Sequence, residues 1–155
     1  MSEIIRYEIE NSYTDYGNFE TQIIYANKIW ENAFGNTYDT GECPSNNIIV
    51  GYDNDSNAVS CAIFDIQNDS ALISCVASNP TNIGNGTKLM YRLIEVLKDK
   101  NIKYAALNIT LDENKTRLER FYEKFGFIHK TTDNTSHFDY DESIEIQKIC
   151  YIMKK

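Results

Sequence analysis

The 155-residue chain is poor in the residues that interrupt regular structure, with 7 glycines and 2 prolines. Intrinsic disorder is not expected, because 42% of the residues are hydrophobic and can build a substantial core. No apolar run approaches the roughly 18 residues that a membrane-spanning helix needs. The stretch MSEIIRYEIE also lacks the basic and then apolar segments of a signal peptide. We therefore expect one compact cytoplasmic domain over residues 1–155.

Positive charge is also scarce, since 15 lysines and arginines stand against 23 acidic residues, for a net charge of −8. Nucleic acids and anionic membranes require a basic face, so neither is expected as the main partner. The cysteines Cys43, Cys61, Cys75 and Cys150 form no C-x-x-C pair and have no histidine at ligand spacing, so we expect no metal site. Cys61 and Cys75 lie in apolar stretches and are expected to be buried, reduced thiols.

Hydrophobic periodicity predicts an alternation of strands and helices along the chain. Short turns rich in asparagine and aspartate separate three consecutive strands, which favours antiparallel hairpins. The order suggests an α+β fold of three layers, a mixed and mostly antiparallel sheet of about 6–7 strands flanked by helices. The expected strands cover 3–10, 47–52, 58–66, 71–78, 104–111, 127–131 and 146–153, and the expected helices cover 18–34, 84–100 and 114–125.

The stretch TNIGNGTKL, residues 81–89, lies between an expected strand and an expected helix. Glycines at a helix start let several backbone N–H groups point at one anion, and the helix dipole favours negative charge there. A plain flexible turn is the alternative interpretation. The sequence excludes two known phosphate loops. A dinucleotide fingerprint needs a glycine at position 89, which is leucine here. A P-loop needs Gly-Lys-Ser/Thr, whereas this chain has Gly86-Thr87-Lys88.

A second stretch adds to the first. VASNPTNIGNGTKLM (76–90) and RFYEKFGF (120–127) together resemble the GNAT superfamily of acyl-CoA-dependent N-acetyltransferases, and the order of elements is similar over essentially the whole chain. Residues 81–86 fall on the family's Arg/Gln-x-x-Gly-x-Gly/Ala motif. Thr81 replaces the usual Arg or Gln, Ser78 replaces a common proline, and Asn114 comes one residue before the family's usual asparagine position.

The resemblance implies acetyl-CoA as co-substrate, with its pyrophosphate on the backbone of residues 82–87 and Lys88 assisting. It implies that the Val76 N–H polarises the thioester carbonyl and that the Tyr122 hydroxyl protonates the leaving thiolate. Tyr122 as a plain core aromatic is the alternative, and Phe121 and Phe125 are expected as core. The implied cofactor-binding residues are Cys75, Val76, Ala77, Thr81, Asn82, Ile83, Gly84, Asn85, Gly86, Thr87, Lys88, Asn114 and Tyr122.

The general base is not identifiable, because the central strand before Val76 carries no acidic residue. Loop candidates are Asp39, Glu42, His137 and Asp139, whereas His129 is more typical of a structural histidine. The acidic stretch 133–145, with Asp133, Asp139, Asp141, Glu142 and Glu145, is usually a solvated loop. The resemblance implies instead that this loop lines the acceptor site, where it would attract a protonated amine. We therefore expect a small cationic acceptor such as a polyamine, an amino sugar or an amino acid. Alternatives are a protein acceptor, through a lysine or an N-terminal amine, and a degenerate domain that only binds acyl-CoA. A monomer or homodimer is expected.

Overall fold

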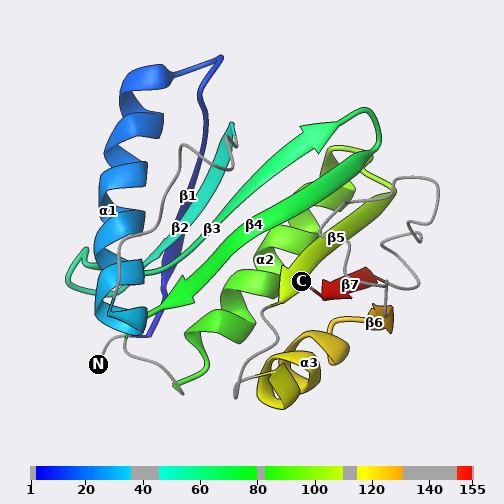
Figure 1. Ribbon diagram of the computed structural model, residues 1–155. Helices are drawn as coiled ribbons and strands as arrows, with labels where there is room; N and C mark the ends of the chain where they lie inside the picture. Colours follow the sequence, from blue (N-terminus) through cyan, green and yellow to red (C-terminus); the bar gives the residue numbers. More distant parts are fainter. Residues whose placement is uncertain (1–2, 36–45, 80–82, 110–114, 131–149, 155) are drawn as a thin grey trace. The chain divides into compact units, whose positions relative to one another are not determined.

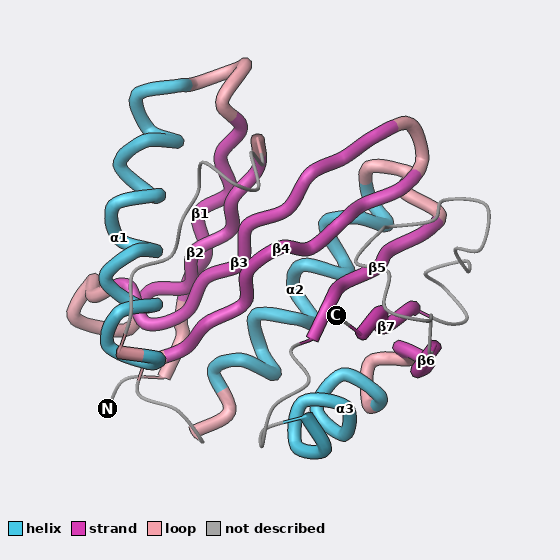
Figure 2. Tube along the Cα trace, viewed as in Figure 1, coloured by secondary structure: helices cyan, strands magenta, loops and turns pink. Residues whose placement is uncertain are grey.

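The computed structural model describes residues 3–35, 46–79, 83–109, 115–130 and 150–154 (Figure 1). The chain divides into two compact units. Unit 1 comprises residues 1–65 and 74–93, and unit 2 comprises residues 66–73 and 94–155. Figure 2 colours the helices, strands and loops differently. Strand β4 (Ser70–Ser78) and helix α2 (Asn85–Asp99) each run from one unit into the other.

Unit 1 contains β1 (Arg6–Asn11), α1 (Tyr16–Phe34), β2 (Asn47–Tyr52) and β3 (Ala58–Gln67) up to Asp65, with the parts of β4 and α2 that fall within its residues. Strands β1, β2 and β3 pair antiparallel. The short turn between β2 and β3 predicts this for that pair, whereas the pairing of β1 with β2 was not predicted. Along β3 and β4, Ser60 contacts Ala77 and Ser74 contacts Ile63. These contacts run in opposite order along the two strands, so β4 continues the antiparallel arrangement.

Helix α1 begins and ends at residues that satisfy its backbone. The Asp15 carboxylate accepts a hydrogen bond from the Asn18 N–H at 3.1 Å, which caps the first turn. Gly35 has a φ of 74° and donates its N–H to Glu31, so it ends the helix in the left-handed conformation expected of a glycine there. The buried face of α1 packs on alternate residues of the strands. This core comprises Phe19, Ala26, Ile29, Ile48, Val50, Tyr52, Cys61, Ile63 and Ala77.

Unit 2 contains β5 (Tyr104–Ile109), α3 (Lys115–Glu123), β6 (Phe127–Lys130) and β7 (Cys150–Lys154), with the parts of β4 and α2 that fall within its residues. Its strand order is β4-β5-β7-β6, and the three neighbouring pairs are parallel. The fold is thus a mixed sheet of seven strands flanked by helices. Every element type was predicted in order, with ends that differ by a few residues. Within the described ranges, no helix is long and apolar enough to cross a membrane.

Candidate active site

The glycine-containing loop joins the end of β4 at Ser78 to the start of α2 at Asn85. Gly84 has a φ of +89°, and an added Cβ would find no atom within 4 Å. Glycine is therefore required at Gly84 by backbone conformation and not by crowding within the protein. The first turn of α2 itself contains no acidic residue, so no side chain of that turn opposes an anion by like charge. Thr81 and Asn82 lie outside the described residues.

The N-terminal segment Glu3–Ile5 is held against the first turn of α2. The buried Asn85 side chain accepts a hydrogen bond from the Ile4 N–H at 3.0 Å. The Glu3 carboxylate pairs with the Lys88 ammonium. This pairing lowers the pKa of Glu3, through the hydrogen bond and then the Coulomb attraction of Lys88. Lys88, predicted to assist a pyrophosphate, is therefore already engaged with a carboxylate of its own chain.

The last residues of β4 are fixed on their β3 side. The Ser60 hydroxyl donates to the Ala77 carbonyl at 3.1 Å and shares a 2.7 Å hydrogen bond with the Ser78 hydroxyl. In unit 2 the parallel register of β4 with β5 covers Ser70–Ile73, which ends three residues before Val76. Val76 is half-buried and Ala77 is buried. Cys75 contributes its backbone to β4, and its side chain is outside the described part.

Tyr122 lies in the last turn of α3 within a group of aromatic rings. Its side chain is 7% exposed. The ring meets Phe121 edge to face at 4.9 Å between centroids and Phe127 at 5.8 Å. Phe121 and Phe125, expected as core, are only half-buried, and the Lys124 ammonium lies 4.6 Å from the Phe121 ring centroid. The two neighbouring rings thus contribute to holding the Tyr122 ring, and its hydroxyl is the group that a proton transfer would use.

Several predicted residues cannot be placed. Asn114 and the base candidates Asp39, Glu42, His137 and Asp139 lie outside the described residues, as does the acidic stretch 133–145. The backbone of His129 is in β6, and its side chain is not described. Among the described residues, no group of three histidine, cysteine or acidic side chains is arranged to hold a metal.

Sequence reasoning missed the second role of the helix start, namely its attachment to the N-terminal segment. Asn85 was predicted from its place in the motif, but the Ile4–Asn85 bond joins residues 81 positions apart. Hydrophobic periodicity carries no signal for such a contact, because it reports only local neighbours. Glu3 lies in the expected first strand but precedes the observed one, which begins at Arg6. This shorter strand leaves Glu3 available to Lys88.

The sequence model of the Acetyltransferase (GNAT) family matches residues 7–127. The chain belongs to this family. It is therefore an acyltransferase of the GNAT type, and the matched residues include the glycine loop, the end of β4 and Tyr122. No curated protein sequence matches the chain.

Solved structures of acetyltransferases have the same fold at low sequence identity. The ribosomal-protein-S18-alanine N-acetyltransferase from Escherichia coli has a TM-score of 0.65 and 18% identity, covering 90% of this chain and 88% of its own. The PaiA N-acetyltransferase from Thermoplasma acidophilum, in complex with coenzyme A, has a TM-score of 0.57 and 18% identity, with coverages of 84% and 94%. The catalytic domain of the Tetrahymena GCN5 histone acetyltransferase, also with coenzyme A, has a TM-score of 0.57 and 17% identity, with coverages of 94% and 95%.

Proposed function

We propose that this GNAT protein transfers an acetyl group from acetyl-CoA to the primary amine of a small cationic acceptor. The observation that carries the proposal is the connection from β4 to α2, where Gly84 has a positive φ directly before a helix start without acidic residues. Such a start presents backbone N–H groups and a positive dipole end to a phosphate. The same proposal takes residues 1–155 as a single domain that works in the cytoplasm as a monomer or homodimer.

Acetyl-CoA supplies the activated acyl group as a thioester. The backbone of residues 82–87 is proposed to hold the pyrophosphate, with Asn114 as a further contact. The backbone of Cys75, Val76 and Ala77 is proposed to hold the pantetheine arm as an added strand. Support comes from β4, because its register with β5 ends at Ile73 and Ser60 fixes the carbonyl of Ala77 from the β3 side. A strand held on one side presents its other backbone groups in a fixed row.

In the transfer step, the acceptor nitrogen attacks the carbonyl carbon and the carbon–sulfur bond breaks. The Val76 N–H donates to the carbonyl oxygen as negative charge develops there. The Tyr122 hydroxyl gives its proton to the departing sulfur, because a tyrosine holds its proton until a basic thiolate develops. The nitrogen loses a proton to a base or a water chain. The acidic stretch 133–145 is proposed to attract the protonated acceptor.

Cofactor binding is tested by thermal unfolding with acetyl-CoA, CoA and ATP. A ligand at 100 times its Kd stabilises a fold by roughly 2.7 kcal/mol. For a domain of this size the melting temperature should rise by roughly 5–10 °C. A rise with acetyl-CoA and CoA but not with ATP supports the proposal. No rise with any of the three would instead favour a degenerate member that has lost its cofactor site. Thr81→Arg would then be the first substitution to test for recovery of binding.

Acceptor class is tested by thiol release from acetyl-CoA in the presence of different amines. The panel contains a polyamine, an amino sugar, an amino acid, a lysine-containing peptide and a peptide with a free N-terminal alanine. The peptides are included because two neighbours in fold are named for protein acceptors, the ribosomal-protein-S18-alanine and histone acetyltransferases. Release with a small amine and not with the peptides supports the proposal. Release with the peptides alone would identify a protein acetyltransferase.

A further inference from the structure

Unit 1 contains a cavity of about 400 Å³, and among the residues that the structure describes, none of those proposed for acetyl transfer lines it. It lies between one face of α1, the turn from β2 to β3 and the residue that follows β4. A cavity of this volume is in the lower range of small-molecule sites. The lining residues are Tyr25, Lys28, Ile29, Asn32, Tyr52, Ser56, Asn57, Ala58 and Asn79.

The helix side of the cavity is a single stripe of α1. Tyr25, Lys28, Ile29 and Asn32 recur at intervals of three and four residues and therefore lie on one face of the helix. Ile29 is buried, whereas the other three expose polar groups or an aromatic ring toward solvent. Among the described residues, no carboxylate pairs with Lys28. This stripe offers a positive charge beside an aromatic ring.

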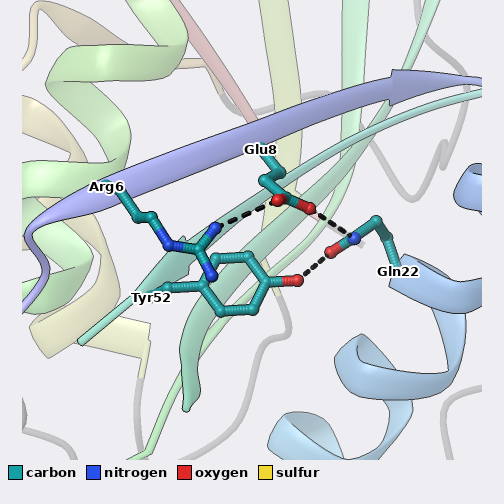
Figure 3. Close-up of polar contacts among 4 residues, drawn as sticks. All are labelled: Arg6, Glu8, Gln22 and Tyr52. Atoms are coloured by element: carbon teal, nitrogen blue, oxygen red, sulfur yellow. Dashed lines mark hydrogen bonds and ion pairs between the residues drawn. The ribbon is translucent and has the colours of Figure 1, made fainter. Parts of the chain in front are cut away.

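The floor is formed by Tyr52, whose ring is held from several directions. The Arg6 guanidinium lies 4.1 Å from its centroid, and Tyr25 meets it edge to face at 6.4 Å. The Tyr52 hydroxyl donates to Gln22, whose amide donates to Glu8 at 2.8 Å, and Glu8 pairs with Arg6 at 3.0 Å (Figure 3). Burial raises the pKa of Tyr52 further above neutral, and its hydroxyl is a protonated donor at neutral pH. The floor is therefore preorganised.

The opposite rim is equally fixed, because the turn from β2 to β3 is built around the buried Asp53. Its carboxylate accepts from the N–H groups of Asp55 at 2.9 Å and Asn57 at 3.0 Å. Ser56 has a φ of 62°, which places this residue in the left-handed region and holds the rim in one conformation. Asn79 is anchored by its N–H to the Val59 carbonyl at 2.9 Å. The rim thus presents side-chain amides and a hydroxyl from a rigid backbone.

We propose that this cavity binds a small carboxylate that carries a flat apolar group. Lys28 supplies the only full charge among the described lining residues, and it is positive. The amides of Asn32, Asn57 and Asn79 and the Ser56 hydroxyl are hydrogen-bond donors that a carboxylate satisfies. Tyr25, Ile29 and Ala58 offer an apolar surface for a ring. A cation of the same size would meet Lys28 and is rejected. This site is additional to the proposed transferase site, and its described lining includes no residue proposed for acetyl transfer.

The test is a titration of the full chain, labelled with ¹⁵N, with three probes of one size: benzoate, benzamide and benzylamine. It is carried out without CoA, so the outcome does not depend on the transferase proposal. Benzoate is expected to shift the amide signals of Tyr25, Asn32 and Asn57, with benzamide weaker and benzylamine without effect. Equal binding of benzylamine, or benzoate shifts confined to other parts of the chain, would overturn the proposal.

Three variants test which side chains bind the carboxylate. Lys28→Gln should weaken benzoate binding about tenfold, since it removes a charged hydrogen-bond partner. The matched control is Lys98→Gln, which removes the same charge from the last turn of α2 and should leave binding unchanged. Asn32→Ala keeps the charge, favours the helix and should cost about two- to fivefold in affinity. If Lys28→Gln and Lys98→Gln bind benzoate equally well, while both give the wild-type amide spectrum elsewhere, the carboxylate site is wrong.

Discussion

At the residue scale, one oxygen atom separates the two roles of Tyr122. The ring is 7% exposed and packs against Phe121 and Phe127, which phenylalanine would do equally well. Tyr122→Phe should therefore keep the fold and the Kd for CoA, while kcat falls about a hundredfold because the thiolate loses its proton donor. Tyr16→Phe, at an exposed tyrosine in the first turn of α1, is the control. A parallel loss of CoA affinity and kcat would assign Tyr122 to packing.

Replacement by alanine is expected to change the stability of the chain in opposite directions at Gly84 and Gly17. Gly84 has a φ of +89°, where a Cβ is strained even in open space, so Gly84→Ala should destabilise the chain by about 1–2 kcal/mol. Gly17, in the first turn of α1, has only an ordinary contact at 3.9 Å. Gly17→Ala should stabilise the chain by about 0.4–1 kcal/mol, because the unfolded state loses freedom. Urea unfolding measures both, and a loss of stability at Gly17 equal to that at Gly84 would refute the conformational explanation.

At the element scale, the N-terminal segment competes with the proposed pyrophosphate for Lys88 at the start of α2. Because Lys88 pairs with Glu3, Glu3→Gln should free the ammonium and tighten CoA binding by about two- to fivefold. Calorimetric titration at low salt measures the change. Glu20→Gln, at an exposed position of α1, removes the same charge and should change CoA binding little. If both variants tighten binding alike, the cause is the net charge of the chain and not the Glu3–Lys88 pair.

The same pair predicts a dependence on pH. Lys88 lowers the pKa of Glu3 in the folded state, so the ionised carboxylate stabilises the fold above its unfolded pKa. That contribution is lost as the pH falls through the lowered, folded pKa. The difference in melting temperature between Glu3→Gln and the wild type should therefore be present at neutral pH and vanish in acid. A difference that persists unchanged when the carboxylate is protonated would show that the pair is not its origin.

Local signals made the elements predictable, and long-range contacts limited the prediction of the site. Helix α1 was expected from residue 18, but the Asp15 side chain caps it and moves its start to Tyr16. Gly35 and Gly126, both with positive φ, follow helices as expected. The Arg6–Glu8–Gln22–Tyr52 network was not foreseen, because it joins β1, α1 and β2 through polar side chains. Hydrophobic periodicity does not indicate which polar side chains form hydrogen bonds with each other.

At the scale of the whole molecule, the net negative charge of the chain repels the proposed cofactor as it approaches. The chain carries a net charge of −8, and CoA is an anion. Long-range repulsion reaches about 30 Å at 0.01 M salt but only about 8 Å at 0.15 M. The attraction of the backbone dipoles at the start of α2 acts only over a few ångströms, which is shorter than the screening length at either salt concentration. Screening should therefore remove the repulsion before it removes the local attraction.

The association rate constant of CoA is consequently expected to rise with ionic strength, the reverse of a site with a broad basic surface. Stopped-flow mixing between 0.01 M and 0.15 M salt would measure an increase of about two- to tenfold, with a smaller change in the dissociation rate. Glu3→Gln, with one negative charge fewer beside the helix start, should show a weaker dependence on salt than Glu20→Gln. A rate constant that falls as salt is added would mean that local positive charge dominates the encounter, and that the acidity of the chain lies away from the path of the cofactor.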